Sequence, residues 1–221
     1  MTTSTRTRLF LSRLARTVSA AALAVTFSNC TSTTKEVRIS VRDQKLALYD
    51  QGQLVRTYGV STSKFGCGDG RSTNCTPIGK LQVAKKIGDG MPPGMVFKSR
   101  RPTGEVIRPD APGRDPIVTR IMWLAGNDGK TCNAYSRFIY IHGTPEERNI
   151  GHQASYGCIR MRSMDIIDLY SRVPVGTAVR IDRGGLPPEA KSMPEYVYSG
   201  PFRPAPTSRP GVSSATGVAR R

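Results

Sequence analysis

An alternation of apolar and polar residues between residues 36 and 63 is the feature that most constrains the fold. The sequence there is EVRISVRDQKLALYDQGQLVRTYGVSTS. Apolar side chains recur about every second position in three runs, which hold Val37, Ile39 and Val41, then Leu46 and Leu48, then Val55, Tyr58 and Val60. A period of two is typical of strands with one buried face, and the polar segments DQK and DQGQ supply turns. We therefore predict a β-meander at the start of the domain.

The central part of the chain continues the β pattern and adds one helix. Four further apolar runs predict strands: LQVAKKI, PIVTRIMWLAG, RFIYIHG and TAVRID. MDIIDLYSRV predicts a helix with Ser163 as its N-cap and with Pro174 and Gly176 after its end. Its expected buried face consists of Ile166, Ile167, Leu169 and Tyr170. The fold class that follows is mainly β, with one short helix, over residues 36–182.

Residues 88–116 interrupt the strands with many glycines and prolines, as in GDGMPPGM and RPDAPGRDP. A loop of this length inside a compact domain is usually functional. It predicts an ordered loop or flap on the substrate side of the domain. Its basic residues suit a substrate with carboxylates, although a solvated basic face explains them equally well: Lys98, Arg100, Arg101 and Arg108.

Both ends of the chain differ in composition from this domain. Residues 1–30 combine early arginines with the short apolar run VSAAALAVTF, which is typical of an export signal and too short for a transmembrane helix. Two endings compete. ALA at residues 22–24 could be a cleavage site, and FSNC resembles a lipobox that makes Cys30 a lipidated first residue, which we favour. Residues 31–35 predict a polar tether, and residues 183–221 predict a disordered tail rich in proline and arginine.

The formal net charge of +17 raises the question of a polyanionic partner. Nucleic acid, a membrane surface or another polyanion would all fit such a charge. Many of the cations belong to the two ends, however: Arg6, Arg8, Arg13, Arg16, Arg203, Arg209, Arg220 and Arg221. We therefore expect no nucleic-acid site. A secreted nucleic-acid-binding protein remains a competing reading, which binding by the core without its tails would favour.

Export implies an oxidising compartment, in which disulfides persist. Cys67 and Cys75 bracket the turn-rich loop CGDGRSTNC, which predicts a short structural disulfide. Cys132 has no obvious partner and competes with either of these two cysteines for pairing. Cys158 differs from them because of its neighbours.

The segment YIHGTPEERNIGHQASYGCIRM brings together both histidines of the chain and Cys158. An imidazole that takes the proton of a thiol leaves a strong nucleophile, so His142 and Cys158 predict a cysteine acyl-transfer site. They lie 16 residues apart, far enough for a loop to fold back. Gly157 permits a sharp turn, after which the N–H groups of Gly157 and Cys158 could form an oxyanion hole.

A zinc site made of His142, His152 and Cys158 is an alternative interpretation of the same segment. Histidine and cysteine are ordinary zinc ligands. The spacing lacks the i, i+3 or i, i+4 pairs of familiar zinc motifs, so we expect no metal.

IHGT followed by ASYGCIRM resembles the signature of the L,D-transpeptidase (YkuD-like) catalytic domain family, and TPIGK and TRIMWLAG resemble its order of segments. The resemblance covers about residues 36–182 and implies a β-sandwich-like domain. It makes Cys158 the nucleophile and His142 the general base, and it places the Gly143 carbonyl where it orients the imidazole. It implies that Ser155 and Gly157 shape the catalytic loop. Arg160 would either face the carboxylates of the substrate or brace that loop.

Tyr156 departs from the family pattern, which often has histidine directly before Gly-Cys. A tyrosine can replace the hydrogen bonding of that histidine but not its proton affinity near pH 7. His152 is a candidate to compensate, but we favour an unrelated surface position for it. The departure leaves room for a non-catalytic envelope lipoprotein that only binds peptidoglycan.

The resemblance implies a role in peptidoglycan biosynthesis, cell-wall organisation and cell shape. Cys158 would attack the carbonyl of the third residue of a tetrapeptide stem, and D-alanine would leave. The acyl group would then pass to an amine of a neighbouring stem, to a protein lysine or, in an L,D-carboxypeptidase, to water. The acyl-transfer reaction that the resemblance implies requires no organic cofactor. We expect a monomer in the periplasm or cell envelope, with stem peptides as partners and a membrane anchor at Cys30.

Overall fold

Strands from the two ends of the domain meet in the middle of one sheet. The computed structural model describes residues 34–126 and 128–203, so the predicted signal, the tether up to residue 33 and Cys30 lie outside the described residues. β1 (Lys35–Ser40) pairs in parallel with β10 (Ala178–Asp182), and β10 pairs antiparallel with β4 (Gly79–Ile87). This pairing joins the first and last strands of the sheet.

The predicted β-meander is confirmed. β1, β2 (Lys45–Asp50) and β3 (Gln53–Gly59) pair antiparallel in sequence order. The β2–β3 turn places Gln51 and Gly52 at φ values of 51° and 78°, the left-handed backbone that a tight hairpin turn requires.

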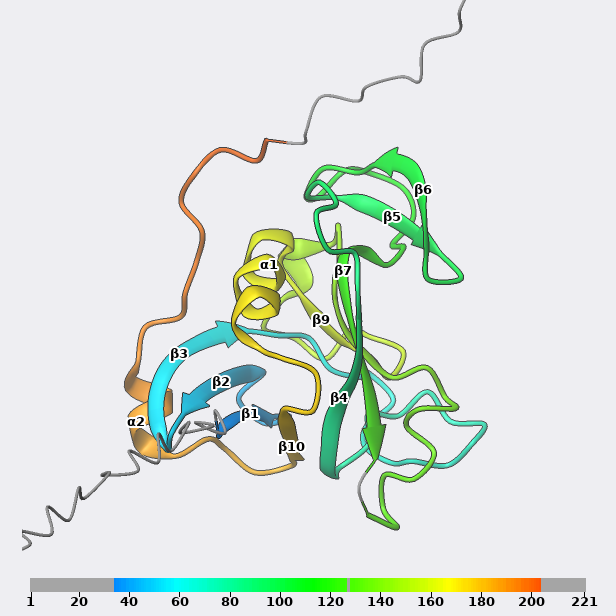
Figure 1. Cartoon of the computed structure of the whole chain (residues 1–221). Helices are drawn as coiled ribbons and strands as arrows, with labels where there is room; N and C mark the ends of the chain where they lie inside the picture. The colour runs from blue at the N-terminus through cyan, green and yellow to red at the C-terminus, as the bar shows by residue number, and fades with distance from the viewer. Residues whose placement is uncertain (1–33, 127, 204–221) are drawn as a thin grey trace, which may run out of the picture. The chain divides into compact units, whose positions relative to one another are not determined.

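Ten strands form one hydrogen-bonded sheet, in which the main path runs β3-β2-β1-β10-β4-β7-β5-β6 (Figure 1). β8 pairs with β7 and with β9, away from this path. The remaining strands are β5 (Met95–Lys98), β6 (Arg101–Val106), β7 (Val118–Gly126), β8 (Tyr140–Gly143) and β9 (Ile159–Met161). The mainly β class is therefore confirmed.

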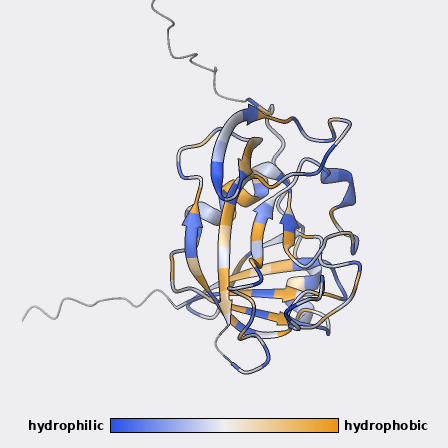
Figure 2. Ribbon diagram, turned by 90° about the vertical axis from the view of Figure 1, so that its right-hand side faces the viewer, coloured by the Kyte–Doolittle hydropathy of each residue, from blue (hydrophilic) through white to orange (hydrophobic). Residues whose placement is uncertain are grey.

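Nine of the strands and helices contribute to a single buried core, as the alternation of apolar positions predicts. Hydrophobic and hydrophilic positions alternate along several strands (Figure 2). The largest fully buried side chains of this core are Tyr58, Ile39, Leu46, Leu48, Leu81, Met122, Leu124, Ile141, Ile159, Met161 and Ile166. β8 and β9, which flank the predicted site, are thus anchored in the core.

The predicted helix is present as α1 (Ser163–Arg172), but its predicted cap is wrong. Arg162 occupies the N-cap position and provides no side-chain cap. The N–H of Ser163 donates instead to Oε1 of Glu147, at 2.8 Å. Glu147 belongs to the short 3-10 helix η1 (Glu147–Asn149), so a side chain from the preceding loop satisfies the helix end.

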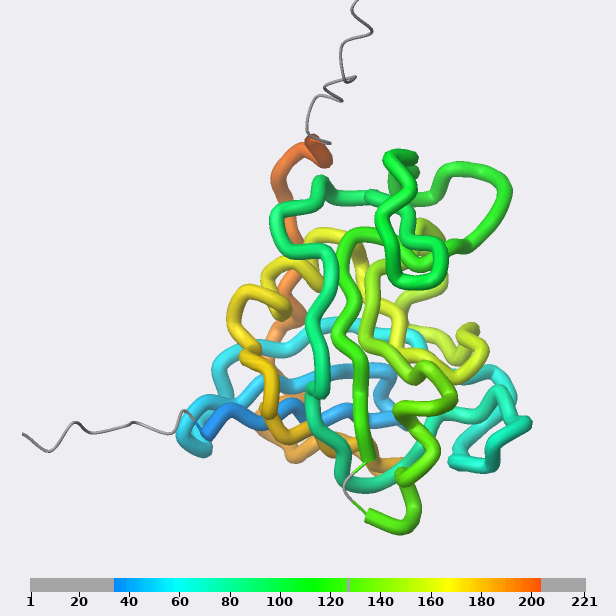
Figure 3. The backbone as a smooth tube through the Cα atoms, turned by 45° about the vertical axis from the view of Figure 1, so that its right-hand side comes forward, coloured from blue at the N-terminus to red at the C-terminus, as the bar shows by residue number. Residues whose placement is uncertain are grey.

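Residues 88–116 are ordered, as predicted. They contain the antiparallel hairpin of β5 and β6, which is linked to the rest of the sheet through the pairing of Val96 with Val118. The hairpin, drawn in green, lies at the upper end of the domain in Figures 1 and 3. We call residues 95–106 the flap.

The prediction of a disordered tail is wrong for residues 183–203. This segment contains α2 (Pro188–Ser192), whose Ala190 packs with Leu186, Ala47 and Tyr49. Beyond α2 the chain runs beside β3, where the N–H of Tyr196 donates to the carbonyl of Thr57 at 2.8 Å. Apolar side chains among the prolines supply the burial that composition alone does not reveal. Residues 204–221 lie outside the described residues.

No helix in the described part of the chain is long and apolar enough to cross a membrane.

We predict that Leu169→Ala lowers the free energy of unfolding by about 2–4 kcal/mol, because Leu169 is fully buried where α1 packs on the sheet and its truncation leaves a cavity. Val175→Ala is the matched control, since Val175 is 58% exposed just after α1. Urea unfolding followed by circular dichroism measures both. Equal losses for the two variants would contradict the packing of α1 described above.

Candidate active site

His142 and Cys158 lie toward the same side of the β8–β9 pair. β8 and β9 are parallel, and His142 is opposite Arg160. The Cys158 side chain packs in an apolar cluster with Trp123 and Tyr140, and Tyr140 is two residues before His142 on β8. Because alternate residues of a strand share a face, the imidazole lies on the same face as the thiol.

His142 is buried and its hydrogen bonding fixes its tautomer. Nδ1 lies 2.8 Å from the carbonyl oxygen of Gly143. A carbonyl only accepts, so Nδ1 carries the proton and Nε2 keeps its lone pair. Burial lowers the pKa of His142 to about 4, and the nearby positive charge of Arg160 lowers it further. The ring is therefore neutral at pH 7 and can accept a proton.

The Cys158 thiol is held against the backbone of the turn that precedes β8. Sγ lies 3.4 Å from the carbonyl oxygen of Phe138. Burial raises the pKa of Cys158 to about 11, while a backbone hydrogen bond from Tyr140 and the charges of Arg160 and Arg137 act in the opposite direction. At neutral pH the resting site thus holds a neutral thiol and a neutral imidazole. The thiolate of Cys158 therefore forms only when the thiol gives up its proton.

Ser155 shapes the loop before Cys158 through both of its polar groups. Its hydroxyl donates to the carbonyl of Cys158 at 2.6 Å, and its own backbone N–H donates to the carbonyl of Thr62 at 2.9 Å. The N–H of Gly157 donates to Ser155 Oγ at 3.2 Å. The N–H of Gly157 is thus engaged inside the loop, so an oxyanion role for the predicted Gly157–Cys158 pair stays a prediction, with the N–H of Cys158 as its main donor.

Gly157 is required by space and by backbone conformation. Its φ is +118°, and a Cβ there would lie 3.3 Å and 3.4 Å from the carbonyl oxygens of Cys75 and Asn74. Its carbonyl accepts a hydrogen bond from Thr76 Oγ1 at 3.0 Å. The segment that ends at Thr76 thus forms a wall directly behind the catalytic loop.

Arg160 is a buried brace. Its side chain is 10% exposed and pairs with Asp115 at 2.7 Å and with Glu146 at 3.7 Å. Of the two roles considered for it, the contacts favour bracing, because both partners belong to loops of the protein. The positive charge of Arg160 nevertheless lowers the pKa of both His142 and Cys158.

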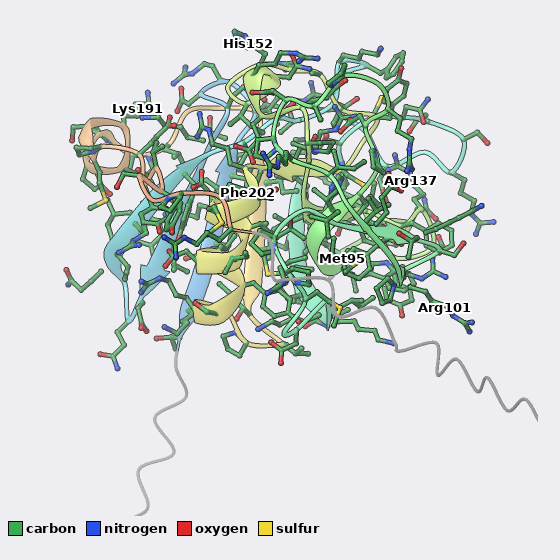
Figure 4. All side chains as sticks on the ribbon, turned by 90° about the horizontal axis from the view of Figure 1, so that it is seen from above. Met95, Arg101, Arg137, His152, Lys191 and Phe202 are labelled. Carbon is green, nitrogen blue, oxygen red and sulfur yellow. The ribbon has the colours of Figure 1, made fainter. Side chains whose placement is uncertain are left out.

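Tyr156 and His152 both lie at the surface. Tyr156 is 57% exposed, accepts a hydrogen bond from Lys64 Nζ at 3.0 Å and packs against Phe65. His152 is exposed, and Figure 4 shows it at the outer edge of the domain, away from Met95 in the apolar cluster. Within residues 34–126 and 128–203, no group of three His, Cys, Asp or Glu side chains is placed to hold a metal ion.

Comparison with known proteins decides the family. The pattern of the YkuD family, described as the L,D-transpeptidase catalytic domain, matches residues 34–181. The chain belongs to the L,D-transpeptidase catalytic domain family. The provisionally assigned L,D-transpeptidase YqjB of Bacillus subtilis is 30% identical over 145 residues, which cover 66% of this chain and 69% of YqjB.

Other similar proteins carry the same family name. The provisionally assigned L,D-transpeptidase YkuD of Bacillus licheniformis is 29% identical over 146 residues, covering 66% of this chain and 64% of that protein. The crystal structure of L,D-transpeptidase 3 from Mycobacterium tuberculosis with a faropenem-derived adduct has a TM-score of 0.45 and 17% identity, over 67% of this chain and 60% of that one.

The L,D-transpeptidase domain contains a charged support that the sequence did not reveal. Arg137 pairs with Asp69 at 2.8 Å, and both side chains are buried. The same guanidinium donates to the carbonyls of Gly68, Thr73 and Cys75. Arg137 therefore ties the wall behind Gly157 to the segment that enters β8. No spacing pattern links residue 137 to residues 68–75, so sequence reasoning had no signal for it.

An aromatic cluster next to Cys158 was also missed. Trp123 stacks on Tyr135 with ring centroids 4.1 Å apart and meets Tyr140 edge-on at 5.5 Å. Phe138 lies 5.5 Å from Trp123 and has a φ of 58°. The strand pattern of RFIYIHG predicted β8. It did not predict that Phe138 ends the preceding turn with a left-handed backbone.

The predicted disulfide between Cys67 and Cys75 is absent, since both thiols are free in the structure. A backbone bridge pairs Cys67 with Thr76, the residue after Cys75. The Cys75 thiol donates to the carbonyl of Phe65 at 3.2 Å, whereas Cys67 packs against the core. Cys132 is free and exposed.

We predict that Cys158 of the resting protein reacts slowly with iodoacetamide at pH 7 and faster with each pH unit up to about 11, because burial keeps the thiol protonated below that pH. Peptide-resolved mass spectrometry separates Cys158 from the other cysteines. Urea-unfolded protein is the control and should follow an ordinary thiol. A rate that levels off below pH 7 would indicate a preformed thiolate–imidazolium pair instead.

We also predict that Gly157→Ala lowers stability by about 1–3 kcal/mol and slows acylation of Cys158, because the new Cβ meets the wall and the backbone is left-handed. Gly151→Ala is a matched control, since Gly151 has a φ of +95° but open space around it. Thermal unfolding and the rate of carbapenem adduct formation report the two effects. If both variants lose the same stability and the same rate of adduct formation, contact of the new Cβ with the wall has no effect on either quantity.

Proposed function

We propose that this chain is a peptidoglycan L,D-transpeptidase in which Cys158 is the nucleophile and His142 the general base. One observation carries the proposal: a thiol and a neutral imidazole lie on the same side of the β8–β9 pair. The bond from Nδ1 to the Gly143 carbonyl leaves Nε2 as the proton acceptor. Membership of the L,D-transpeptidase catalytic domain family supports this assignment of the two residues.

Acylation follows from the neutral resting pair. As Sγ of Cys158 bonds to the carbonyl carbon of the third stem residue, its proton passes to Nε2 of His142. When the tetrahedral intermediate collapses, the amide C–N bond breaks, and His142 gives the proton to the departing amine of D-alanine. A thioester remains on Cys158, and the imidazole is neutral again for the second step.

The charges around the site favour the intermediate more than the resting state. Arg160 and Arg137 lower the pKa of the thiol, and both are held in place by ion pairs with Asp115 and Asp69. Fixed positive charges of this kind stabilise negative charge that develops on sulfur and oxygen during attack. The N–H of Cys158 is the backbone donor that we assign to the oxyanion.

The acceptor of the acyl group completes the reaction. An amine of a neighbouring stem gives a cross-link between two third residues, which we favour. A protein lysine would give a wall-attached protein, and water would release the free acid. A protein that binds stem peptides without turnover is the non-catalytic outcome.

We further propose that the protein works in the cell envelope. The basic and apolar pattern of residues 1–30 supports export, and FSNC supports a lipid on Cys30. A lipid there would hold the domain near a membrane through the tether of residues 31–35. We assign the protein as a monomer, because its proposed site is built within one chain.

We predict that Cys158→Ala lowers turnover of a tetrapeptide-containing muropeptide at least about 10³-fold, since it removes the nucleophile, and that His142→Ala lowers it about 10²- to 10⁴-fold. Mass spectrometry of the products identifies cross-links, D-alanine release or no reaction. Cys132→Ala is the matched control for loss of a thiol. A carbapenem should add one acyl group to the wild type and none to Cys158→Ala.

Two results would contradict the proposal. Cross-linking by Cys158→Ala at the wild-type rate would show that another group is the nucleophile. Folded wild-type protein that gains no mass with a carbapenem and releases no D-alanine would be a non-catalytic binder.

A further inference from the structure

Arg100, at the tip of the flap, lies over the aromatic cluster next to Cys158. Its Cζ is 5.0 Å from the ring centroid of Trp123 and 5.0 Å from that of Phe138. One of its nitrogens lies 3.4 Å from the Tyr140 hydroxyl oxygen. Aromatic faces hold a guanidinium in a fixed plane while leaving most of its N–H groups available. The flap thus presents an oriented cation to the region of the thiol.

The backbone that presents Arg100 is unusual. Ser99 and Arg100 have φ values of 49° and 67° and form the two-residue turn between the paired residues Lys98 and Arg101. Such turns favour asparagine and glycine, because other residues are strained at positive φ. Phe138, beneath the guanidinium, also has a positive φ of 58°. Residues at positive φ persist where surrounding contacts hold them, so the backbone on both sides supports this contact.

The charge of Arg100 is not balanced by the protein. Among residues 34–126 and 128–203, no carboxylate forms an ion pair with Arg100. Arg137 and Arg160, the other two cations near the site, are paired with Asp69 and Asp115. Arg100 is therefore the cation in this region whose donors are left for a carboxylate from outside the protein.

Arg100 and Cys158 both contact Phe138, which points to one particular carboxylate as the ligand of Arg100. Sγ of Cys158 lies 3.4 Å from the carbonyl oxygen of Phe138, and the ring of the same residue supports Arg100. In a tetrapeptide donor, the C-terminal carboxylate follows the attacked carbonyl by one residue, and one residue spans about 3.5 Å. A guanidinium fork matches a carboxylate with two parallel hydrogen bonds.

We propose that Arg100 binds the C-terminal carboxylate of the acyl-donor peptide and thereby selects donors that end one residue after the reacting carbonyl. This inference rests on the proposed function and adds a specificity-determining residue to it. Because Arg100 belongs to the flap, binding of the carboxylate would also tie the flap to the donor peptide. Extension of the peptide by a further residue would move the carboxylate away from the guanidinium.

The test measures binding without chemistry. The Cys158→Ala protein is titrated calorimetrically with a tetrapeptide donor that has a free C-terminal acid and with the same peptide as a C-terminal carboxamide. We expect the acid to bind about 10- to 100-fold more tightly than the amide, the range for loss of a hydrogen bond to a charged group. Adding Arg100→Gln should lower affinity for the acid to the level of the amide.

Matched variants separate a specific contact from a general effect. Arg101→Gln removes an exposed cation from the same hairpin and should keep the preference for the acid. Arg100→Lys keeps the charge without the planar fork and should retain part of the preference. If Arg100→Gln fails to fold, a preference in Arg100→Lys that equals that of the parent protein overturns the proposal.

Two further outcomes would overturn it. The first is equal affinity for acid and amide in Cys158→Ala. The second is an Arg100→Gln variant that loses affinity for both peptides in proportion and so keeps their ratio. Failure of the proposed function is distinguishable, because it appears as absence of turnover in the wild type while the acid–amide preference of Cys158→Ala persists.

Discussion

The parallel pairing of β8 with β9 is the constraint on which the site depends. It places His142 opposite Arg160 and brings the loop before β9 back beside Tyr140. Residues separated by 16 positions in the sequence thereby share one face of the sheet. Both strands are anchored in the main core by Ile141, Ile159 and Met161, so the relative position of thiol and imidazole is set by core packing.

Burial at this position determines the chemistry of the pair. A site that stabilised charge in the resting state would hold a thiolate and an imidazolium. Here desolvation favours the neutral form of both groups, and the guanidinium groups of Arg137 and Arg160 oppose it only for sulfur. Negative charge is stabilised best at the moment when it forms, which is the condition for catalysis rather than tight ground-state binding.

The sequence predicted the parts of this structure that follow from local periodicity. The meander, β4, β7, β8, β10 and α1 all agree with patterns of apolar residues, and the approach of His142 to Cys158 was expected from one loop that folds back and from the turn at Gly157. The contacts that support the site could not be predicted in this way. Arg137 reaches residues 68–75 across the fold, Glu147 caps α1 from a separate segment, and Cys67 and Cys75, which look paired in the sequence, are both free. Each depends on packing between segments that are distant in the chain.

The segment that follows α2 extends the folded unit past the family match, which ends at residue 181. Glu195 bridges to Thr57 on β3, which is the last strand on its side of the sheet, and Thr57 Oγ1 donates to the carbonyls of Met193 and Pro194. An unpaired outer strand is a template for association with other chains. A protein that ended at the family boundary would expose the edge strand β3. Residues 193–196 cover this edge and so reduce its tendency to pair with other chains.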